Sequence, residues 1–334
     1  MDGSKQPPTV AHLTSVIEAG ERSEAITCLA VVETAAPRRR KEAVQALRNL
    51  TDEQPEVVTP VLPALTPFLT DDERAVRLTT AKLFVAVAES HPEAVTSLAP
   101  VLADRLADDD EFYYVRARAA EALGYVARER PSAVDSPEVL ADFRVGLSFD
   151  EPAVKVKLAK ALECVALGNP RRLRHHVSTL AEHLDDDEEL VRYHLCTALA
   201  AVGCDYPDVL SDASSALIAR LSDESASVRG RAAEVLGLWL RAASETPPNV
   251  RSALTELATD DDAFVRHRAS FARNLPVDET DAFAEVGTVD GLRATTEDAV
   301  TEITSPDGDA ACPHCDLALP ESGPPLCPRC GAPH

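Results

Sequence analysis

The sequence predicts an all-α protein, an α-solenoid of stacked helix pairs. A Val-Arg or Val-Lys pair recurs along the 334 residues at separations of 39, 39, 37, 37 and 37. A repeat of this length is typical of helical units that cannot bury their apolar faces alone. Only 4% of the residues are aromatic, so we expect a core of Ala, Leu and Val, which favours packed helices over a sheet. The pairs are Val76-Arg77, Val115-Arg116, Val154-Lys155, Val191-Arg192, Val228-Arg229 and Val265-Arg266.

Proline marks the helices that alternate with the Val-Arg helices. It is favoured in the first turn of a helix, where its missing N–H costs no hydrogen bond. An acidic turn follows each proline-led helix, so the predicted unit is helix, acidic turn, helix and proline break, repeated about six to seven times. The prolines are Pro55, Pro92, Pro137, Pro170, Pro207 and Pro248.

The repeat pattern also sets the domain boundaries. Two helices predicted over Pro8 to Glu18 and Ser23 to Thr34 either cap the stack or form a worn first repeat. After the last repeat, ten carboxylates and one base indicate an acidic linker in which only Ala294 to Ile303 has weak helical character. The four regions are 1–36 (cap or first repeat), 37–274 (solenoid), 275–310 (linker) and 311–334 (a terminal module).

The charge composition narrows the classes of function. The net charge is −23, and six Lys stand against 27 Arg. This composition resembles that of proteins from prokaryotes with molar salt in the cytoplasm, where the Debye length falls to roughly 3 Å and self-repulsion costs little. It counts against sequence-independent binding of duplex DNA, which needs clustered cations. With no secretory leader or apolar span of ~20 residues, we expect a cytoplasmic protein with no membrane contact.

An acid stands six positions before the base of most Val-Arg pairs. Over residues 37–274 this pattern resembles the HEAT repeat, in the variant called PBS-lyase HEAT-like. The resemblance implies that these side chains form a ladder of hydrogen bonds from one repeat to the next. One repeat departs from the pattern, because Phe149 stands six positions before Lys155 and Asp150 stands five, so we expect a weak rung there. The ladder pairs are Asp71/Arg77, Asp110/Arg116, Asp186/Arg192, Asp223/Arg229 and Asp260/Arg266.

A second basic series lies two positions after the ladder bases. Two residues correspond to about 200° around a helix, so this series cannot share the face of the ladder. In the resembling solenoids the second helix of each unit lines the concave surface, which implies a partner-binding stripe for an acidic peptide or a phosphate. The alternative is a solvated helix face, with Arg118–Glu121 and Arg231–Glu234 as i,i+3 pairs. The series is Arg118, Lys157, His194, Arg231 and Arg268.

No constellation of residues indicates catalysis. Relatives named for a lyase activity attach bilins, but the repeat motif does not carry that chemistry. A related di-iron hydroxylase uses His-Glu pairs, and this sequence has no His-Glu dipeptide. Gly-rich phosphate loops and nucleophile triads are also absent from the sequence. We therefore predict that the chain is not an enzyme and has no small-molecule substrate, and that its clustered histidines lie on a solvated face: His175, His176, His183 and His194.

Four cysteines near the end of the chain have the spacing of a metal site. Two Cys-x-x-Cys knuckles separated by eleven residues resemble the very short zinc ribbons of prokaryotic proteins. Four thiolates favour one structural Zn²⁺, with iron as the lesser alternative. Without metal, a module of 24 residues is expected to be unfolded. The ligands are Cys312, Cys315, Cys327 and Cys330.

Together these features predict a scaffold or adaptor that binds a partner protein on its concave face. The zinc ribbon would provide a second contact, with either protein or nucleic acid. The alternative is a nucleic-acid-associated accessory protein of the chromosome or of transcription, which would need a continuous Arg surface. The sequence does not name the partner, the pathway or the oligomeric state.

Overall fold

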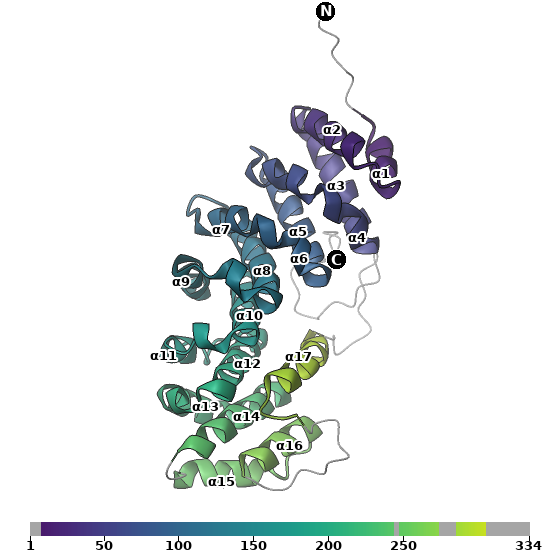
Figure 1. Cartoon of the computed structure of the whole chain (residues 1–334). Helices are drawn as coiled ribbons and strands as arrows, with labels where there is room; N and C mark the ends of the chain where they lie inside the picture. Colours follow the sequence, from purple (N-terminus) through teal and green to yellow (C-terminus); the bar gives the residue numbers. More distant parts are fainter. Residues whose placement is uncertain (1–7, 244–246, 274–284, 305–334) are drawn as a thin grey trace, which may run out of the picture.

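The computed structural model describes residues 8–243, 247–273 and 285–304, and every regular element in these ranges is helical. The helices form a curved stack two layers deep, with the N-terminal helices at one end and α15 and α16 at the other (Figure 1). The described part of the chain is therefore an α-solenoid, as the repeat pattern predicts. The stack begins with α1 (Val10–Glu18) and α2 (Arg22–Glu33), close to the helices predicted for the N-terminal region.

The inner layer holds the Val-Arg helices, which line the concave side of the stack (Figure 1). Most are 17 residues long, and each one that carries a Val-Arg or Val-Lys pair begins two residues before that pair. Buried Ala, Val and Leu side chains on these helices join one core that runs the length of the solenoid. The inner helices are α3 (Pro37–Glu53), α5 (Arg74–Ser90), α8 (Tyr113–Glu129), α10 (Pro152–Gly168), α12 (Glu189–Asp205), α14 (Ala226–Ala242) and α16 (Ala263–Ala272).

The outer layer is less regular, because prolines interrupt the α-helical hydrogen bonding. Pro63 and Pro67 both lie inside the helix η1 (Thr59–Thr70), which has 3-10 geometry. Other outer segments are α4 (Pro55–Val58), α6 (Pro92–Val95), η2 (Thr96–Leu98), α7 (Ala99–Ala107), η3 (Pro131–Val134), α9 (Pro137–Val145), η4 (Gly146–Ser148), η5 (Pro170–Arg172), α11 (Val177–Ala181), η6 (Pro207–Ala213), α13 (Ser214–Arg220) and α15 (Pro248–Leu257).

Neighbouring inner helices approach each other most closely where small residues face each other. A Cβ atom added to Gly168 at the end of α10 would lie 2.1 Å from the carbonyl oxygen of Ala127 on α8, and one added to Gly124 would lie 2.8 Å from the Ala161 Cα. Any larger side chain at these two glycines would push α8 and α10 apart. Small residues thus bring the polar side chains of successive inner helices within hydrogen-bonding range.

The acidic segment after the last repeat contains a helix where a short, weak one was expected, and this helix is docked on the solenoid. Helix α17 (Val289–Thr304) is longer than the predicted Ala294–Ile303 stretch and contacts α10 and α12. Leu292 is fully buried, and α17 lies on the concave side of the solenoid (Figure 1). The many carboxylates of this segment hid the short apolar stripe by which the helix packs.

Candidate functional site

A ladder of ion pairs joins the acidic turns of successive repeats. Arg192 donates to both carboxylate oxygens of Asp223 at 2.9 Å and also to the Asp186 carbonyl oxygen in its own repeat at 2.9 Å. Each such arginine therefore fixes its own turn and the turn of the next repeat. Equivalent rungs are Arg40–Asp71, Lys155–Asp186 and Arg229–Asp260.

The expectation for Asp110 is wrong. Asp110 is exposed, and the neighbouring Glu111 accepts hydrogen bonds from Arg77 at 2.8 to 3.1 Å. Ten residues separate Leu106 from Arg116 here, against eight between Leu69 and Arg77, so the turn carries two extra residues. The insertion changes which carboxylate faces the preceding repeat, and the longer Glu111 side chain makes the rung.

The next rung has no carboxylate partner across the repeats. The Arg116 guanidinium lies 5.3 Å from the centre of the Phe149 ring, donates to the Leu106 carbonyl oxygen at 2.8 Å and pairs with Asp109 of its own turn. At the far end, Arg266 donates to the carbonyl oxygens of Asp260 and Asp261 at 2.7 Å. The ladder bases thus form their contacts within the solenoid.

The basic series on the concave face divides into two halves, because α17 packs on α12 and the C-terminal part of α10, and its Thr295 reaches Arg231 of α14 and Arg268 of α16. We call the concave surface of α12, α14 and α16 the covered half, and that of α3, α5 and the N-terminal parts of α8 and α10 the open half. In the covered half, the side chains of three bases are at most 1% exposed: His194, Arg231 and Arg268. They cannot form an accessible stripe, which corrects the expectation for these three residues.

Carboxylates balance the charges of the covered half. Glu234 accepts hydrogen bonds from Arg231 at 2.7 Å and from Arg268 at 2.8 Å, and the pKa of Glu234 is lowered because these two cations outweigh the effect of its burial. His194 Nδ1 lies 2.8 Å from a carboxylate oxygen of Glu163. Arg231–Glu234 is the predicted i,i+3 pair, but it is buried rather than solvated.

The open half is organised around Glu121. The Glu121 carboxylate contacts Arg118 at 2.7 Å and Lys157 at 2.9 Å, and the side chains of these two bases are 24% and 27% exposed. Burial alone would raise the pKa of Glu121, but the charges of Lys157, Arg118 and Lys160 lower it to about 2. Arg118 and Lys157 are therefore the two members of the predicted stripe that remain accessible.

Lys82 adds a cation to the open half for which the described residues supply no carboxylate. Burial lowers its pKa, and the nearby Arg118 and Arg48 guanidiniums lower it further. Placing a third cation between two others costs free energy that a local carboxylate would have removed. Arg118 pairs with Glu121 and Arg48 with Asp52. In a chain with a net charge of −23, Lys82 is therefore the cation of this group that the described residues leave without a carboxylate.

The sequence contains a second pattern of charges on this surface, which the basic series two residues after the ladder bases does not include. The position five residues after each ladder base holds Lys82, Glu121, Lys160 and Glu234 in four of the repeats. Lys160 also donates to the Tyr125 hydroxyl at 2.5 Å, which in turn donates to Glu89 at 2.6 Å. Alternating signs at this position predict ion pairs between repeats. Glu121 pairs with Lys160 of the repeat that follows it, whereas Lys82, one repeat before Glu121, forms no ion pair among the described residues.

The cysteine that lines a pocket beneath α17 is not activated for catalysis. A pocket of about 260 Å³ lies beneath the C-terminal part of α17, with Cys164 and His194 in its lining. Burial raises the pKa of the Cys164 thiol to about 12, so it is not a thiolate nucleophile. In residues 8–243, 247–273 and 285–304 no group of three His, Cys, Asp or Glu side chains is placed to hold a metal ion. Of the four histidines predicted on a solvated face, His175 is exposed and His176 and His183 are partly buried, but His194 is buried, which corrects that prediction for His194.

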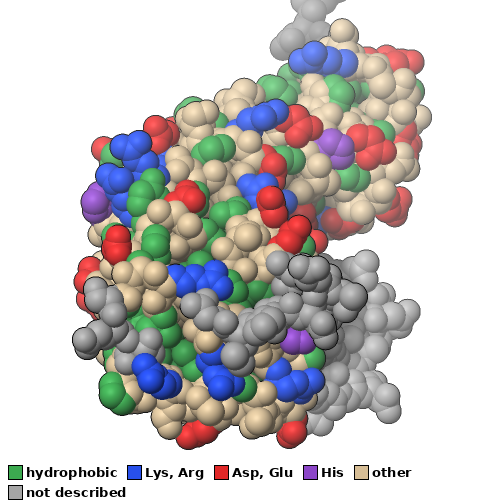
Figure 2. All heavy atoms as spheres, turned by 60° about the horizontal axis from the view of Figure 1, so that its bottom comes forward, with side chains coloured by type: hydrophobic (Ala, Val, Ile, Leu, Met, Phe, Trp, Pro, Cys, Tyr) green, Lys and Arg blue, Asp and Glu red, His purple; other side chains and the backbone are tan. Residues whose placement is uncertain are grey.

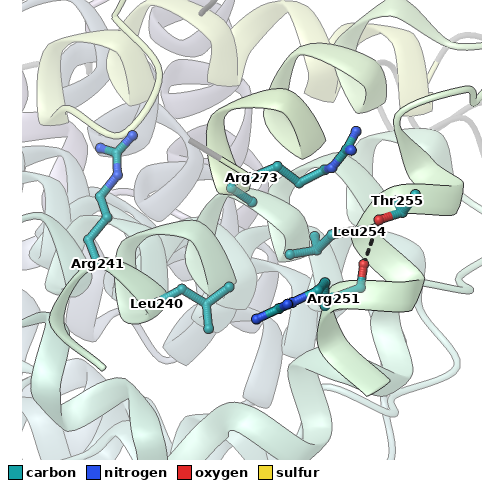
Figure 3. Close-up of a pocket in the computed structure, with 7 residues that line it drawn as sticks. Leu240, Arg241, Arg251, Leu254, Thr255 and Arg273 are labelled. Carbon is teal, nitrogen blue, oxygen red and sulfur yellow. Dashed lines mark hydrogen bonds between the residues drawn. The ribbon is translucent and has the colours of Figure 1, made fainter. Parts of the chain in front are cut away.

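A second pocket, of about 370 Å³, lies at the end of the solenoid formed by α14, α15 and α16. Arg241, Arg251 and Arg273 line it, but their guanidinium groups point in different directions (Figure 3). A single anion would not meet all three. On the face of the molecule seen in Figure 2, Lys and Arg side chains form separate groups with other side chains between them.

Two further predictions from the sequence concern the zinc ligands and the absence of a membrane-spanning segment. The proposed zinc ligands Cys312, Cys315, Cys327 and Cys330 lie outside the described residues. Among the helices that the structure does describe, none combines the length and the apolar character needed to cross a membrane.

Comparisons with known proteins agree with this architecture. Residues 177–272 match a model of HEAT repeats, and residues 37–87 match a model of a HEAT-like repeat. An engineered protein of known structure is 20% identical over 80% of this chain and 70% of its own, with a TM-score of 0.61. No curated protein sequence gives a significant match.

Designed armadillo repeat proteins have the same kind of fold. One of them is 18% identical, with 64% of this chain and 98% of its own covered and a TM-score of 0.54. Another, solved in complex with the peptide (KR)4, is 19% identical over 64% of this chain and 98% of its own, with a TM-score of 0.54. At these identities the likeness concerns the fold alone.

Proposed function

We propose that this chain, an α-solenoid that contains HEAT repeats, is a non-enzymatic scaffold that binds an acidic segment of a partner protein. The binding surface is the open half of the concave face. The observation that carries the proposal is Lys82, half-buried between Arg48 and Arg118 with no carboxylate partner among the described residues. A carboxylate brought by a partner would stabilise this cluster, and an acidic surface elsewhere on the chain would repel competing anions.

The chemistry of the open half favours a peptide segment over duplex DNA. Cations and carboxylates alternate there, as in the Arg118–Glu121–Lys157 cluster, whereas DNA binding draws on many unopposed cations. A partner segment with single, spaced Glu or Asp residues would match this pattern. The armadillo protein that holds the (KR)4 peptide presents the opposite case, a basic peptide, so charge selection on such a surface depends on the residues that line it.

The decisive experiment compares two charge reversals in the full chain. Lys82→Glu places a carboxylate between Arg48 and Arg118, whereas Lys41→Glu makes the same change at an exposed site on α3. In affinity capture at molar salt followed by mass spectrometry, a partner protein held by the parent and by Lys41→Glu should be at least 10-fold depleted with Lys82→Glu. Equal recovery with both variants would refute binding at the open half.

We also propose that the terminal module is a zinc ribbon that gives the scaffold a second contact. Its support is the spacing of Cys312, Cys315, Cys327 and Cys330, which provides four thiolates for one tetrahedral zinc. Two contacts on one chain raise avidity through effective concentration. Metal analysis of the full chain should give one zinc per chain and a loss in Cys312→Ser. A clearly lower content in freshly purified protein, or iron in its place, would contradict the assignment.

A further inference from the structure

Helix α17 does not behave as another unit of the solenoid. In a solenoid each unit contacts only its neighbours along the stack. Arg293 of α17 instead donates to the carbonyl oxygens of Leu167 at 3.0 Å and of Arg128 at 3.1 Å, which lie 126 and 165 residues upstream. The helix thus turns back over the concave face (Figure 1), and it occupies a surface that partners of such a fold would use.

The helix packs through one narrow stripe. Leu292, Thr296 and Ala299 are 0%, 7% and 5% exposed and stand four and three residues apart, which places them on one face. This is the mode by which an amphipathic helix binds a groove on another protein. The remaining faces carry four exposed carboxylates: Asp290, Glu297, Asp298 and Glu302.

The charges of the groove remain balanced without α17. Glu234 holds Arg231 and Arg268 at 2.7 and 2.8 Å, whereas the Thr295 hydroxyl of α17 lies 3.2 and 3.4 Å from these two arginines. Releasing α17 would therefore leave no buried arginine without its carboxylate. Because an unpaired buried charge is strongly destabilising, release of α17 costs less than it would if the helix itself supplied the countercharge of these arginines.

The turn before α17 anchors it to the solenoid. The Gly287 N–H donates to Glu234 at 2.8 Å, and the Gly287 carbonyl oxygen accepts a bond from the Cys204 thiol at 3.4 Å. Gly287 has a φ of 82°, and a Cβ atom there would lie 2.2 Å from the Phe271 ring. This backbone conformation and the lack of space both require glycine, so a side chain at this position would loosen the anchor.

We infer that the covered half is a helix-binding groove that α17 occupies in cis, and that an acidic amphipathic helix of a partner protein takes its place. Such a helix would present a small or apolar stripe like that of Leu292, Thr296 and Ala299, with carboxylates on its other faces. The inference deepens the proposed function, because displacing α17 would extend the open half into one continuous binding surface. Only the sixteen residues 273–288 connect α16 to α17, and a short connection between a helix and its groove gives an effective concentration on the order of millimolar.

A labelled peptide of residues 285–304 tests the inference by fluorescence anisotropy with full-length chains. The parent should bind it weakly, because its own α17 competes. Leu292→Asp in the full chain, which weakens the cis helix, should bind the wild-type peptide at least 10-fold more tightly. Asp298→Asn, on the exposed face of α17, is the matched control and should bind as the parent does.

Equal, weak binding by the parent and by Leu292→Asp, with circular dichroism showing an intact solenoid, would overturn the inference. Gly287→Val provides a second route to the released state and should give the same gain as Leu292→Asp. Hydrogen exchange on the unmodified chain is independent of any variant: the amides of α17 should exchange at least 100-fold faster than those of α12. Equal protection would make α17 a fixed part of the core and reject exchange with a partner.

The outcomes separate this inference from the proposed function. Lys82 lies outside the α17 groove, so Lys82→Glu should leave peptide binding to the Leu292→Asp chain unchanged. If Lys82→Glu loses partner capture but the peptide experiment fails, the open half is a binding surface and α17 is not exchangeable. If Lys82→Glu captures the partner as the parent does but the peptide binds the Leu292→Asp chain tightly, only the helix-binding groove is supported.

Discussion

The two halves of the concave face use equivalent positions of the repeat but balance their charges differently. In the covered half, Glu234 joins Arg231 and Arg268 in a buried cluster. In the open half, Glu121 joins Arg118 and Lys157, whose side chains remain about a quarter exposed, and Lys82 has no acid among the described residues. The difference indicates that position in the repeat fixes where a charge lies, whereas the neighbouring residues decide whether that charge is available to a partner.

The largest expected effect is in the covered half. Glu234→Gln would leave Arg231 and Arg268 buried without a countercharge, and breaking such a pair costs about 3–5 kcal/mol. Chemical denaturation followed by circular dichroism should show this loss. The control, Asp298→Asn on the exposed face of α17, should change the free energy of unfolding by less than ~0.5 kcal/mol. A small loss in Glu234→Gln would mean that water reaches the cluster.

The corresponding change in the open half should be smaller and should depend on pH. Glu121→Gln removes a carboxylate from two partly exposed bases, for an expected loss of about 1–3 kcal/mol at neutral pH. The pKa of Glu121 is lowered to about 2 from its ordinary value of 4.5. The stability it contributes is therefore fully present above pH 4.5 and is lost as the pH falls towards 2. The variant should show a flatter unfolding profile over that range; parallel profiles would argue against the ion cluster.

The charge of Lys82 should lower the free energy of unfolding, whereas the charge of Glu121 raises it. Because the pKa of Lys82 is lowered in the folded chain, its charge costs stability at a pH below the folded-state pKa, and this cost shrinks as the pH rises beyond that pKa and is gone above the ordinary value of 10.5. Lys82→Met should raise the free energy of unfolding by about 0.5–1 kcal/mol and weaken partner capture. Thermal unfolding of Lys82→Met and Lys41→Met together measures this gain, and a destabilised Lys82→Met would show that an undescribed acid already pairs with the lysine.

The smallest effect concerns the shifted rung beside the open half. Asp110→Ala removes an exposed side chain and should change stability by less than ~0.5 kcal/mol. Glu111→Ala removes the partner of Arg77 and should cost several times more. The two midpoints of thermal unfolding, measured side by side, rank the residues. A larger loss from Asp110→Ala would restore the rung expected from the six-residue spacing.

The repeat period was enough to predict the solenoid and most of the ladder spacing, because both depend on contacts between adjacent units. It could not predict the rung at Glu111, since the two extra residues in that turn change the side chain that faces Arg77. It also could not predict the docking of α17, whose partners lie up to 165 residues upstream and have no counterpart in the repeat. The burial of Arg231 and Arg268 depends on that docking, so the stripe was only partly predictable.

Where a base of the ladder pairs across repeats, its partner is the acid of the repeat that follows it, and this direction determines which changes in chain length the ladder tolerates. In the 37-residue repeats the base always meets an acid 31 residues further on, as in Arg40–Asp71, Arg192–Asp223 and Arg229–Asp260. A duplicated unit of 37 residues therefore brings both halves of a new rung, and the old rungs stay in register. A unit of 39 residues does not, and the irregular partners of Arg77 and Arg116 lie at such units. The array can thus gain or lose copies by recombination without compensating mutations, provided that each copy keeps the shorter length.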